Sequence, residues 1–154
     1  MSQGFGHIVN TASIAGLIST PGLVPYSTTK HAVVGLSKSL RAEAAHLGIR
    51  VSVFCPGFVR TAILDEGGKY GKTLMDLSDK QKKQMENELE KYKPIDPDVF
   101  APKALDAVAK NKAIIIIPSW WKFFWWYYRL FPNRAVLASQ KKFDEQNKNI
   151  LARD

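Results

Sequence analysis

The sequence predicts an α/β fold in which parallel strands are joined through helices. Two short apolar runs, at residues 7–10 and 50–55, are typical of strands, because each contains β-branched residues and is followed by small or turn-forming residues. Between them, residues 26–47 carry apolar side chains at every third or fourth position, which predicts one long helix. A strand, a helix and a second strand form a βαβ unit, so we expect a right-handed crossover and parallel strands.

The long helix should pack one apolar face on the sheet. The predicted face consists of Ala32, Val33, Leu36, Leu40 and Ala44. Gly48 follows the last turn and should end the helix, because glycine readily takes the left-handed conformation found there.

Two more helices and a third strand are expected after the βαβ unit. A capping box begins a polar helix over residues 78–92, which indicates a solvent-exposed lid. Asp96 should cap a helix over residues 96–111, in which Pro102 should produce a kink. Residues 113–117 are apolar throughout, which predicts a strand that is buried on both faces.

Length and composition are those of one globular domain. The chain has 154 residues, of which 45% are hydrophobic and 23% charged, so disordered, collagenous and coiled-coil proteins are excluded. Cys55 is the single cysteine, which excludes an internal disulfide; we expect it to be a small core residue. Three scattered histidines and no CxxC pair predict no metal site. The N-terminus lacks the features of a signal peptide, so a cytoplasmic protein is expected.

The net charge of +8 comes from the two ends of the sequence. Residues 1–60 carry five positive charges and one negative, and residues 119–154 carry seven and three, whereas the middle is balanced. An excess of positive charge suggests contact with phosphates or lipid headgroups. No nucleic-acid motif accompanies it, so we expect no nucleic-acid partner.

Three segments carry side chains suited to acid–base chemistry. Tyr26 and Lys30 are four residues apart on the long helix and therefore lie on one face. A tyrosine, whose usual pKa is about 10, is a poor base at neutral pH, but a neighbouring ammonium favours its phenolate. Ser13 follows the first strand and can hydrogen-bond a substrate oxygen while Tyr26 moves the proton. Pro56 and Gly57 end the next strand, at the sheet edge where α/β proteins bind ligands.

Together the segments 8–13, 26–30 and 56–61, which read IVNTAS, YSTTK and PGFVRT, resemble the short-chain dehydrogenase/reductase family. The likeness covers about residues 6–118, which form the catalytic domain in this interpretation, with residues 62–95 as the substrate lid region. The resemblance implies a Rossmann-like, doubly wound parallel sheet. It also implies an oxidoreductase that uses NAD or NADP to interconvert an alcohol and a ketone or aldehyde.

The resemblance also implies roles for single residues. Ser13 would orient the substrate carbonyl, Tyr26 would give or take the proton, and Lys30 would hold the nicotinamide ribose and promote ionisation of the tyrosine. Considered alone, each residue has a simpler interpretation. Ser13 would be a turn or cap residue, Tyr26 a packed aromatic residue whose hydroxyl contacts solvent, and Lys30 a solvent-exposed charge on a helix.

The remaining cofactor contacts would come from the turn after the second strand. By resemblance, Pro56 and Gly57 would shelter the nicotinamide, while the Val59 backbone and the Thr61 hydroxyl would hold its carboxamide. Thr61 alone is more often a helix cap. The helix that bears Tyr26 commonly packs against a partner subunit in such proteins, which suggests a homo-oligomer.

The sequence lacks the family's glycine-rich TGxxxGxG segment, since Gly4 and Gly6 precede the first strand. It therefore matches only the second, carboxyl-terminal half of the doubly wound fold. Two accounts are open: an internal start within a longer enzyme, which we favour, or a truncated product. By itself such a half should be poorly stable, self-associating or dependent on a partner, because its inner strand lacks a neighbour.

The tail, residues 119–154, is aromatic and basic. Residues 120–131 hold nine of the seventeen aromatic residues, yet prolines and cations interrupt them, so they should not span a membrane. Two interpretations have equal weight: a peripheral contact with a membrane surface, or a buried cluster that closes the substrate pocket or a subunit interface. Both favour a large apolar substrate. The alternative function is a truncated, non-catalytic module that binds a membrane or a protein through this tail.

Overall fold

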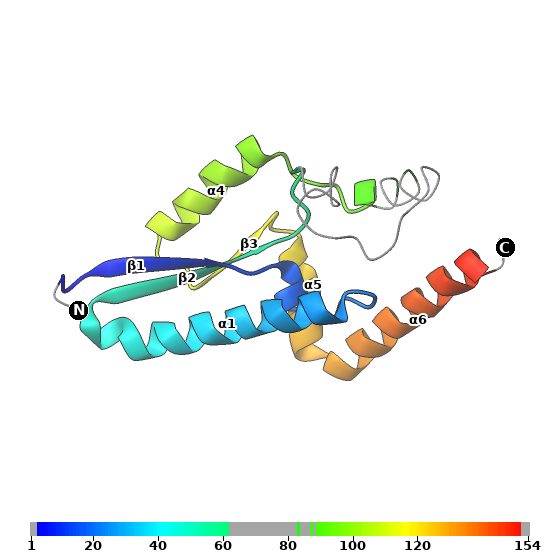
Figure 1. Ribbon diagram of the computed structural model, residues 1–154, viewed down its shortest axis with the longest axis horizontal. Helices are drawn as coiled ribbons and strands as arrows, with labels where there is room; N and C mark the ends of the chain where they lie inside the picture. The colour runs from blue at the N-terminus through cyan, green and yellow to red at the C-terminus, as the bar shows by residue number, and fades with distance from the viewer. Residues whose placement is uncertain (1–2, 62–82, 84–86, 88, 152–154) are drawn as a thin grey trace.

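Three parallel strands form the centre of the molecule (Figure 1). The computed structural model describes residues 3–61, 83, 87 and 89–151. Strands β1 (Gly6–Thr11), β2 (Ile49–Pro56) and β3 (Ile114–Ile117) lie in the order β1-β2-β3. All three predicted strands are therefore confirmed, as is their parallel direction.

The register places the carboxyl ends of the strands side by side. Thr11 lies opposite Phe54, and Pro56 lies opposite Ile117. The ladder continues past the strand ends, where the Gly57 amide donates to the Ile117 carbonyl at 2.9 Å. The segments that follow the strands consequently meet at one edge of the sheet.

Helix α1 (Val24–Ala44) connects β1 to β2, as predicted, but begins two residues earlier than expected. A short 3-10 turn, η2 (Ala45–Leu47), completes the predicted helix, and Gly48 ends it with a φ of 71°. Proline is tolerated in the first turn of a helix, because the amide that it lacks has no partner there. Pro25 is therefore compatible with a helix that begins at Val24, before the predicted first residue.

The buried face of α1 agrees with the predicted one only in part, since Ala44 is buried and Val33 packs against the core as predicted. Leu36 is 60% exposed and Ala32 is also exposed, whereas Val34 and Ser37 are buried. Ser37 can lie inside because its hydroxyl donates to the Val33 carbonyl at 2.6 Å and accepts from the side-chain Nδ2 of Asn10 at 3.0 Å. A hydrogen-bonded serine can occupy a core position, which apolar periodicity alone does not reveal.

Helices cover both faces of the sheet, which confirms the Rossmann-like fold class for this half (Figure 1). Helix α4 (Pro97–Ala109) lies on the face opposite α1, and Asp96 caps it as predicted, by accepting from the Asp98 amide. Alternate residues of β3 serve the two sides: Ile115 and Ile117 pack with α4, and Ile116 packs with the α1 side. Pro102 lies inside α4. Of the predicted lid helix, residues 78–92, only residues 83, 87 and 89–92 belong to the described part.

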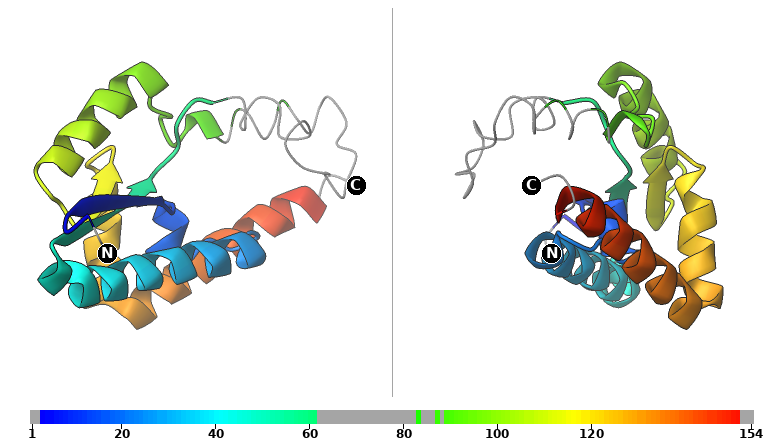
Figure 2. Two further views of the ribbon diagram at one scale, coloured as in Figure 1. Left: turned by 60° about the vertical axis from the view of Figure 1, so that its left-hand side comes forward. Right: turned by 90° about the vertical axis from the view of Figure 1, so that its right-hand side faces the viewer.

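The tail folds into two helices, α5 (Trp121–Leu130) and α6 (Pro132–Leu151). Trp121 is only 5% exposed and belongs to the same apolar cluster as Val53 and Cys55 of the central strand. Figure 2 shows α5 beside β3 and α6 crossing toward the start of α1. In the described part of the chain, no helix is both long enough and apolar enough to cross a bilayer.

Candidate active site

Ser13 stands directly after β1. It caps the short 3-10 helix η1 (Ile14–Gly16), and its Oγ accepts a hydrogen bond from the Ala15 amide at 3.2 Å. In this contact the hydroxyl acts as acceptor, so its own hydrogen stays available to a ligand. The cap role and the proposed substrate role are therefore compatible in one side chain.

The first turns of α1 are fastened to the segment after β1. The Ser27 hydroxyl donates to the Ala15 carbonyl at 2.8 Å. Gly16 permits the contact, because a Cβ at this position would lie 2.5 Å from the carbonyl oxygen of Lys30. Sequence analysis did not single out Ser27 or Gly16; the available signal was a glycine three residues after Ser13, in a segment that the helix must approach.

Tyr26 and Lys30 share one face of α1, as their spacing predicted. The Lys30 ammonium lies 5.4 Å from the centre of the Tyr26 ring and donates to the Thr11 carbonyl at 3.4 Å. Tyr26 is 44% exposed, so its ring can be reached from solvent. Lysine thus joins the tyrosine to the carboxyl end of β1. Among the described residues, no hydrogen bond links Tyr26 to Ser13 directly.

The Pro56–Gly57 turn carries an unexpected neighbour. A Cβ on Gly57 would lie 2.1 Å from Nε1 of Trp121, so the indole occupies the space above this glycine. The Trp121 N–H is buried without a hydrogen-bond partner in the described structure. The first residue of α5 therefore lies against the turn after β2, and the sequence analysis did not single out Trp121 among the aromatic residues of the tail.

Val59 and Thr61 lie further along the same turn. Val59 forms an isolated parallel bridge with Ile95, and the neighbouring Arg60 amide donates to the Ile95 carbonyl at 2.9 Å. Thr61 is exposed and is the last described residue before the predicted substrate region 62–95, of which residues 62–82 lie outside the described part.

Cys55 lies in the core, as the sequence predicted. Cys55 is fully buried, and desolvation raises the pKa of its thiol to about 12, so it is an inert core residue. His31 is exposed, and its Nδ1 lies 2.9 Å from the Ser27 carbonyl. Within the described residues, no group of three metal-ligating side chains comes together.

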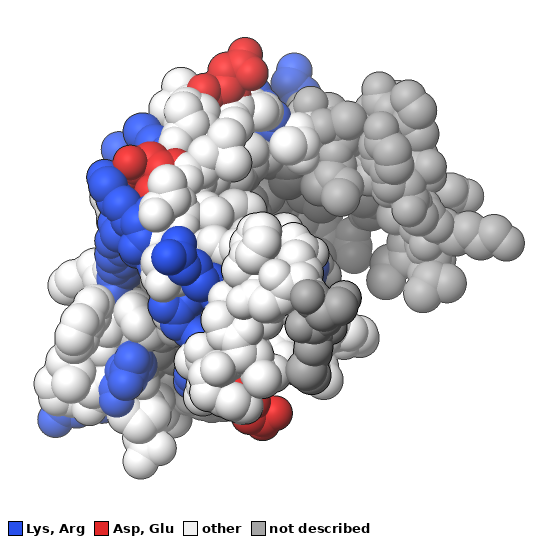
Figure 3. Space-filling view, turned by 90° about the vertical axis from the view of Figure 1, so that its left-hand side faces the viewer, with Lys and Arg blue, Asp and Glu red and all other residues white. Residues whose placement is uncertain are grey.

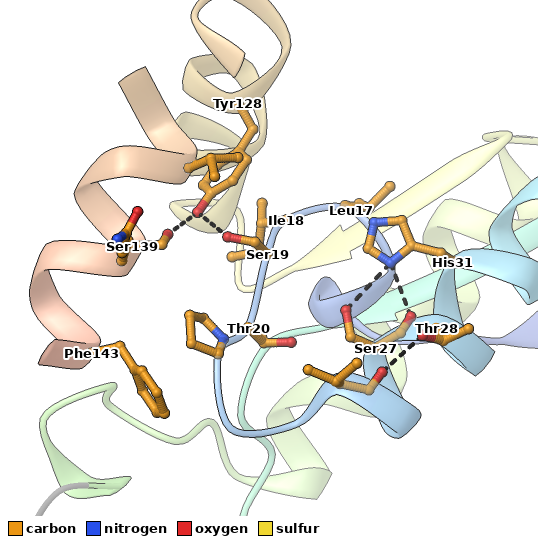
Figure 4. A pocket seen from close by; sticks show the side chains of 14 residues that line it. Leu17, Ile18, Ser19, Thr20, Ser27, Thr28, His31, Tyr128, Ser139 and Phe143 are labelled. Atoms are coloured by element: carbon orange, nitrogen blue, oxygen red, sulfur yellow. Dashed lines mark hydrogen bonds between the residues drawn. The ribbon is translucent and has the colours of Figure 1, made fainter. Parts of the chain in front are cut away.

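A cavity of about 780 Å³ opens on the side of α1 that carries Val24, Ser27 and His31 (Figure 4). It lies between the loop 17–21, the start of α1 and the tail. The Tyr128 hydroxyl holds these parts together through Ser19 of the loop, at 2.8 Å, and through Ser139 of α6. His31 and Phe143 face the same space. The inner side of the tail therefore lines this cavity, which Val24, Ser27 and His31 of α1 also line, whereas Tyr26 and Lys30 are not among its lining residues.

Comparison with known proteins identifies the family to which this chain belongs. Residues 1–70 match the family model for short chain dehydrogenases. The 17-beta-hydroxysteroid dehydrogenase 13 of Rattus norvegicus is 31% identical over 141 residues, 90% of this chain and 40% of that protein. A solved short chain dehydrogenase/reductase from Burkholderia phymatum, in complex with NAD, aligns with a TM-score of 0.59 and 31% identity over 75% of this chain and 44% of its own. This chain belongs to the short-chain dehydrogenase/reductase family.

As a member of this family, the chain spans less than half the length of the curated relatives it matches. It covers 22% of a short-chain dehydrogenase of Penicillium roqueforti, to which it is 49% identical over 61 residues. Residues 1–70, which match the family model, hold the Ser13, Tyr26 and Lys30 segments of this short-chain dehydrogenase/reductase. Because these relatives are named as dehydrogenases, the matches do not favour the alternative of a non-catalytic module.

Proposed function

We propose that this chain carries the catalytic residues of an NAD(P)-dependent oxidoreductase that interconverts an alcohol and a ketone or aldehyde. The observation that carries the proposal is the position of the Lys30 ammonium, 5.4 Å from the Tyr26 ring and hydrogen-bonded to the end of β1. Ser13 lies two residues after Thr11, the last residue of β1. One face of α1 and one strand terminus thus supply an acid–base group, a cation and a hydroxyl donor.

In this proposal Tyr26 transfers the proton. The Lys30 ammonium stabilises negative charge on the phenolate, so that Tyr26 can accept a proton from an alcohol or return it to a carbonyl oxygen. The Ser13 hydroxyl donates to the same oxygen, because its contact with the Ala15 amide leaves the hydrogen free. Lys30 keeps its orientation through the Thr11 carbonyl, and the other two ammonium hydrogens can serve a ligand.

The residues on this edge fit the nicotinamide end of NAD or NADP. When bound, the cofactor supplies or removes the hydride. Lys30 and Tyr26 would hold the ribose, and the turn would hold the nicotinamide through Pro56, Gly57, Val59 and Thr61. The NAD complex of the 31% identical Burkholderia phymatum relative supports this assignment. The pyrophosphate would need a glycine-rich turn that this sequence does not contain.

A large apolar substrate fits better than a sugar. The cavity beside α1, which Tyr26 and Lys30 do not line, has mostly apolar walls, including Leu17, Val24 and Val136, with hydroxyls from Ser19 and Ser139. Ligand pockets of several hundred cubic ångströms commonly combine apolar walls with few polar groups.

The same proposal includes a homo-oligomer. The outward side of α1 carries Leu36, which is 60% exposed, and Gly35, above which there is open space. An exposed apolar side chain on a long, regular helix suits a contact with a second copy of the same helix.

The decisive test is the loss of one hydroxyl. In the full-length protein, Tyr26→Phe should lower kcat by at least about 100-fold, since a positioned general acid–base group contributes about that much. Cofactor binding, measured by fluorescence titration, should weaken by no more than about tenfold, because one hydrogen bond to the ribose is lost and Lys30 still holds it. Tyr127→Phe, which removes a hydroxyl from α5, serves as the matched control and should keep normal turnover. Near-normal turnover of the Tyr26→Phe variant would refute the proposed mechanism.

A further inference from the structure

Helix α5 has two apolar sides, of which the protein uses one. Trp121, Trp125 and Tyr128 point inward and pack in or against the core cluster. Phe123 and Trp126 lie on the other side and are 71% and 55% exposed. Spacings of three and four residues place side chains on one face of a helix. We call the exposed set Phe123, Trp126 and Leu130, the last 61% exposed, the outer stripe of α5.

The outer stripe continues around the end of the helix. Phe131 is 47% exposed, and Leu137, one turn into α6, is 63% exposed. In the right-hand view of Figure 2, α5 forms one flank of the molecule, and no other described element lies outside it. Large exposed apolar patches of this kind mark contacts with proteins or membranes.

The charged residues on either side of the outer stripe in the sequence all have one sign. Between Asp106 and Asp144 the sequence contains no acidic residue and seven basic ones, namely Lys110, Lys112, Lys122, Arg129, Arg134, Lys141 and Lys142. Lys122 and Arg129 are seven residues apart on α5 and therefore lie on the same side of it. The guanidinium groups of Arg129 and Arg134 rest over aromatic rings, 5.1 Å from Trp125 and 5.8 Å from Phe131. Cations and aromatic side chains are thus interleaved on one surface.

This combination argues for a lipid surface rather than a second copy of the chain. Two copies that met through α5 would bring Lys122 and Arg129 together with no carboxylate from residues 107–143 to pair with them. A bilayer with anionic lipids satisfies both features, since tryptophan favours the headgroup region and cations bind lipid phosphates. The unpaired edge of β1 does not belong to this surface either, because β2 and β3 separate it from α5.

We propose that the outer stripe of α5 docks the protein on an anionic membrane surface. Phe123, Trp126 and Leu130 enter the headgroup region with α5 lying parallel to the membrane, while Lys122 and Arg129 bind the lipid phosphates. The contact is peripheral. It is independent of the Ser13–Tyr26–Lys30 chemistry, because none of those residues lies in α5.

Sedimentation with vesicles tests this docking without any assay of activity. The full-length protein should sediment with vesicles of phosphatidylcholine and phosphatidylserine in a ratio of about 3:1, and far less with phosphatidylcholine alone. Lys122→Glu with Arg129→Glu should weaken binding by at least about tenfold, since each cation near an anionic surface contributes about 1 kcal/mol. High salt should weaken wild-type binding in the same direction.

A second variant tests the apolar half of the surface. Phe123→Ser with Trp126→Ser should also abolish sedimentation, with an unchanged circular dichroism spectrum as evidence that the fold persists. Leu105→Ser is the matched control, because Leu105 is 66% exposed on α4, which packs on the other side of the sheet. Its binding should equal that of the wild type. Three results would overturn the proposal: no binding of the wild type to anionic vesicles, retained binding by both double variants, or an equal loss in Leu105→Ser.

Discussion

At the scale of single residues, small side chains set the distances in the candidate site. Gly16 lets the backbone of α1 approach the segment after β1, since a Cβ would lie 2.5 Å from the Lys30 carbonyl oxygen. Gly57 gives the same freedom to Trp121. Neither glycine has a positive φ, so both are required for space rather than for backbone conformation.

We predict that Gly16→Ala lowers both stability and activity. The added methyl group must push α1 away, which costs about 1–3 kcal/mol as other overpacked sites do, and the shift moves Lys30 with its backbone. Urea denaturation and steady-state kinetics would measure the two effects. Gly35→Ala, within α1 itself, is the control, because no atom lies within 4 Å of the new Cβ. It should stabilise the protein by up to about 1 kcal/mol, so a similar loss in both variants would contradict the argument.

At the scale of elements, a line of hydrogen bonds crosses the sheet. The Ser52 hydroxyl donates to the Lys112 carbonyl at 2.7 Å, so the His7 ring must donate to Ser52 through Nε2, at 2.8 Å. This line connects β1, β2 and the residues before β3. Arg41 reinforces the same end through the Val51 carbonyl and through Asn111, whose Oδ1 lies 3.0 Å away. Polar contacts therefore fix the amino end of the sheet, away from the candidate site.

The His7 contact predicts that acid destabilises the fold. Desolvation, followed by the charges of Arg50 and Arg41, lowers the pKa of His7 below its usual value of 6.5. The unfolded chain consequently binds a proton more readily than the folded one, so stability is complete above about pH 6.5 and declines as the pH falls below it. Denaturation midpoints between pH 5 and 8, at intervals of about half a unit, would show the decline. His7→Gln should flatten it, and an unchanged slope in that variant would assign the effect to other groups.

Helix α5 of the tail has one side that packs in the protein and another side that is exposed to solvent. Aromatic residues on every side of α5 gave two interpretations of equal weight from the sequence. The structure assigns Trp121 and Tyr128 to the core and the cavity wall, and leaves Phe123 and Trp126 outside. The part that lines the pocket and the part that faces outward are thus different sides of one helix. The division of the chain at residue 118 stays a prediction.

At the scale of the whole molecule, surfaces of different character lie in different places. Lys and Arg side chains form a band across the end at which the strands begin (Figure 3), whereas Tyr26 and Lys30 lie near the opposite, carboxyl end of β1. Apolar residues of β1, Ile8 and Val9, are 41% and 37% exposed, and within the described structure this strand pairs only with β2. Such an edge needs a neighbour or a cover.

The proposed homo-oligomer can be tested through α1. Leu36→Lys places a charge in the centre of the proposed contact and should shift the protein toward the monomer, as measured by light scattering over a range of concentrations. Leu105→Lys, an equally drastic change at an exposed site of α4, should leave the mass unchanged. If the wild type is monomeric, or if Leu36→Lys leaves the oligomer intact, α1 is not the contact.

The sequence by itself determined the βαβ order, the ends of the strands, the cap at Asp96 and the shared face of Tyr26 and Lys30. These features depend on spacing along the chain, which fixes helix faces and strand termini locally. Only the tertiary structure decided that Ser37 rather than Leu36 faces the core, that Gly16 and Gly57 must lack a side chain, and that Trp121 covers the turn after β2. Each of these outcomes depends on contacts between segments distant in the sequence, and close packing leaves such contacts little room for an extra atom.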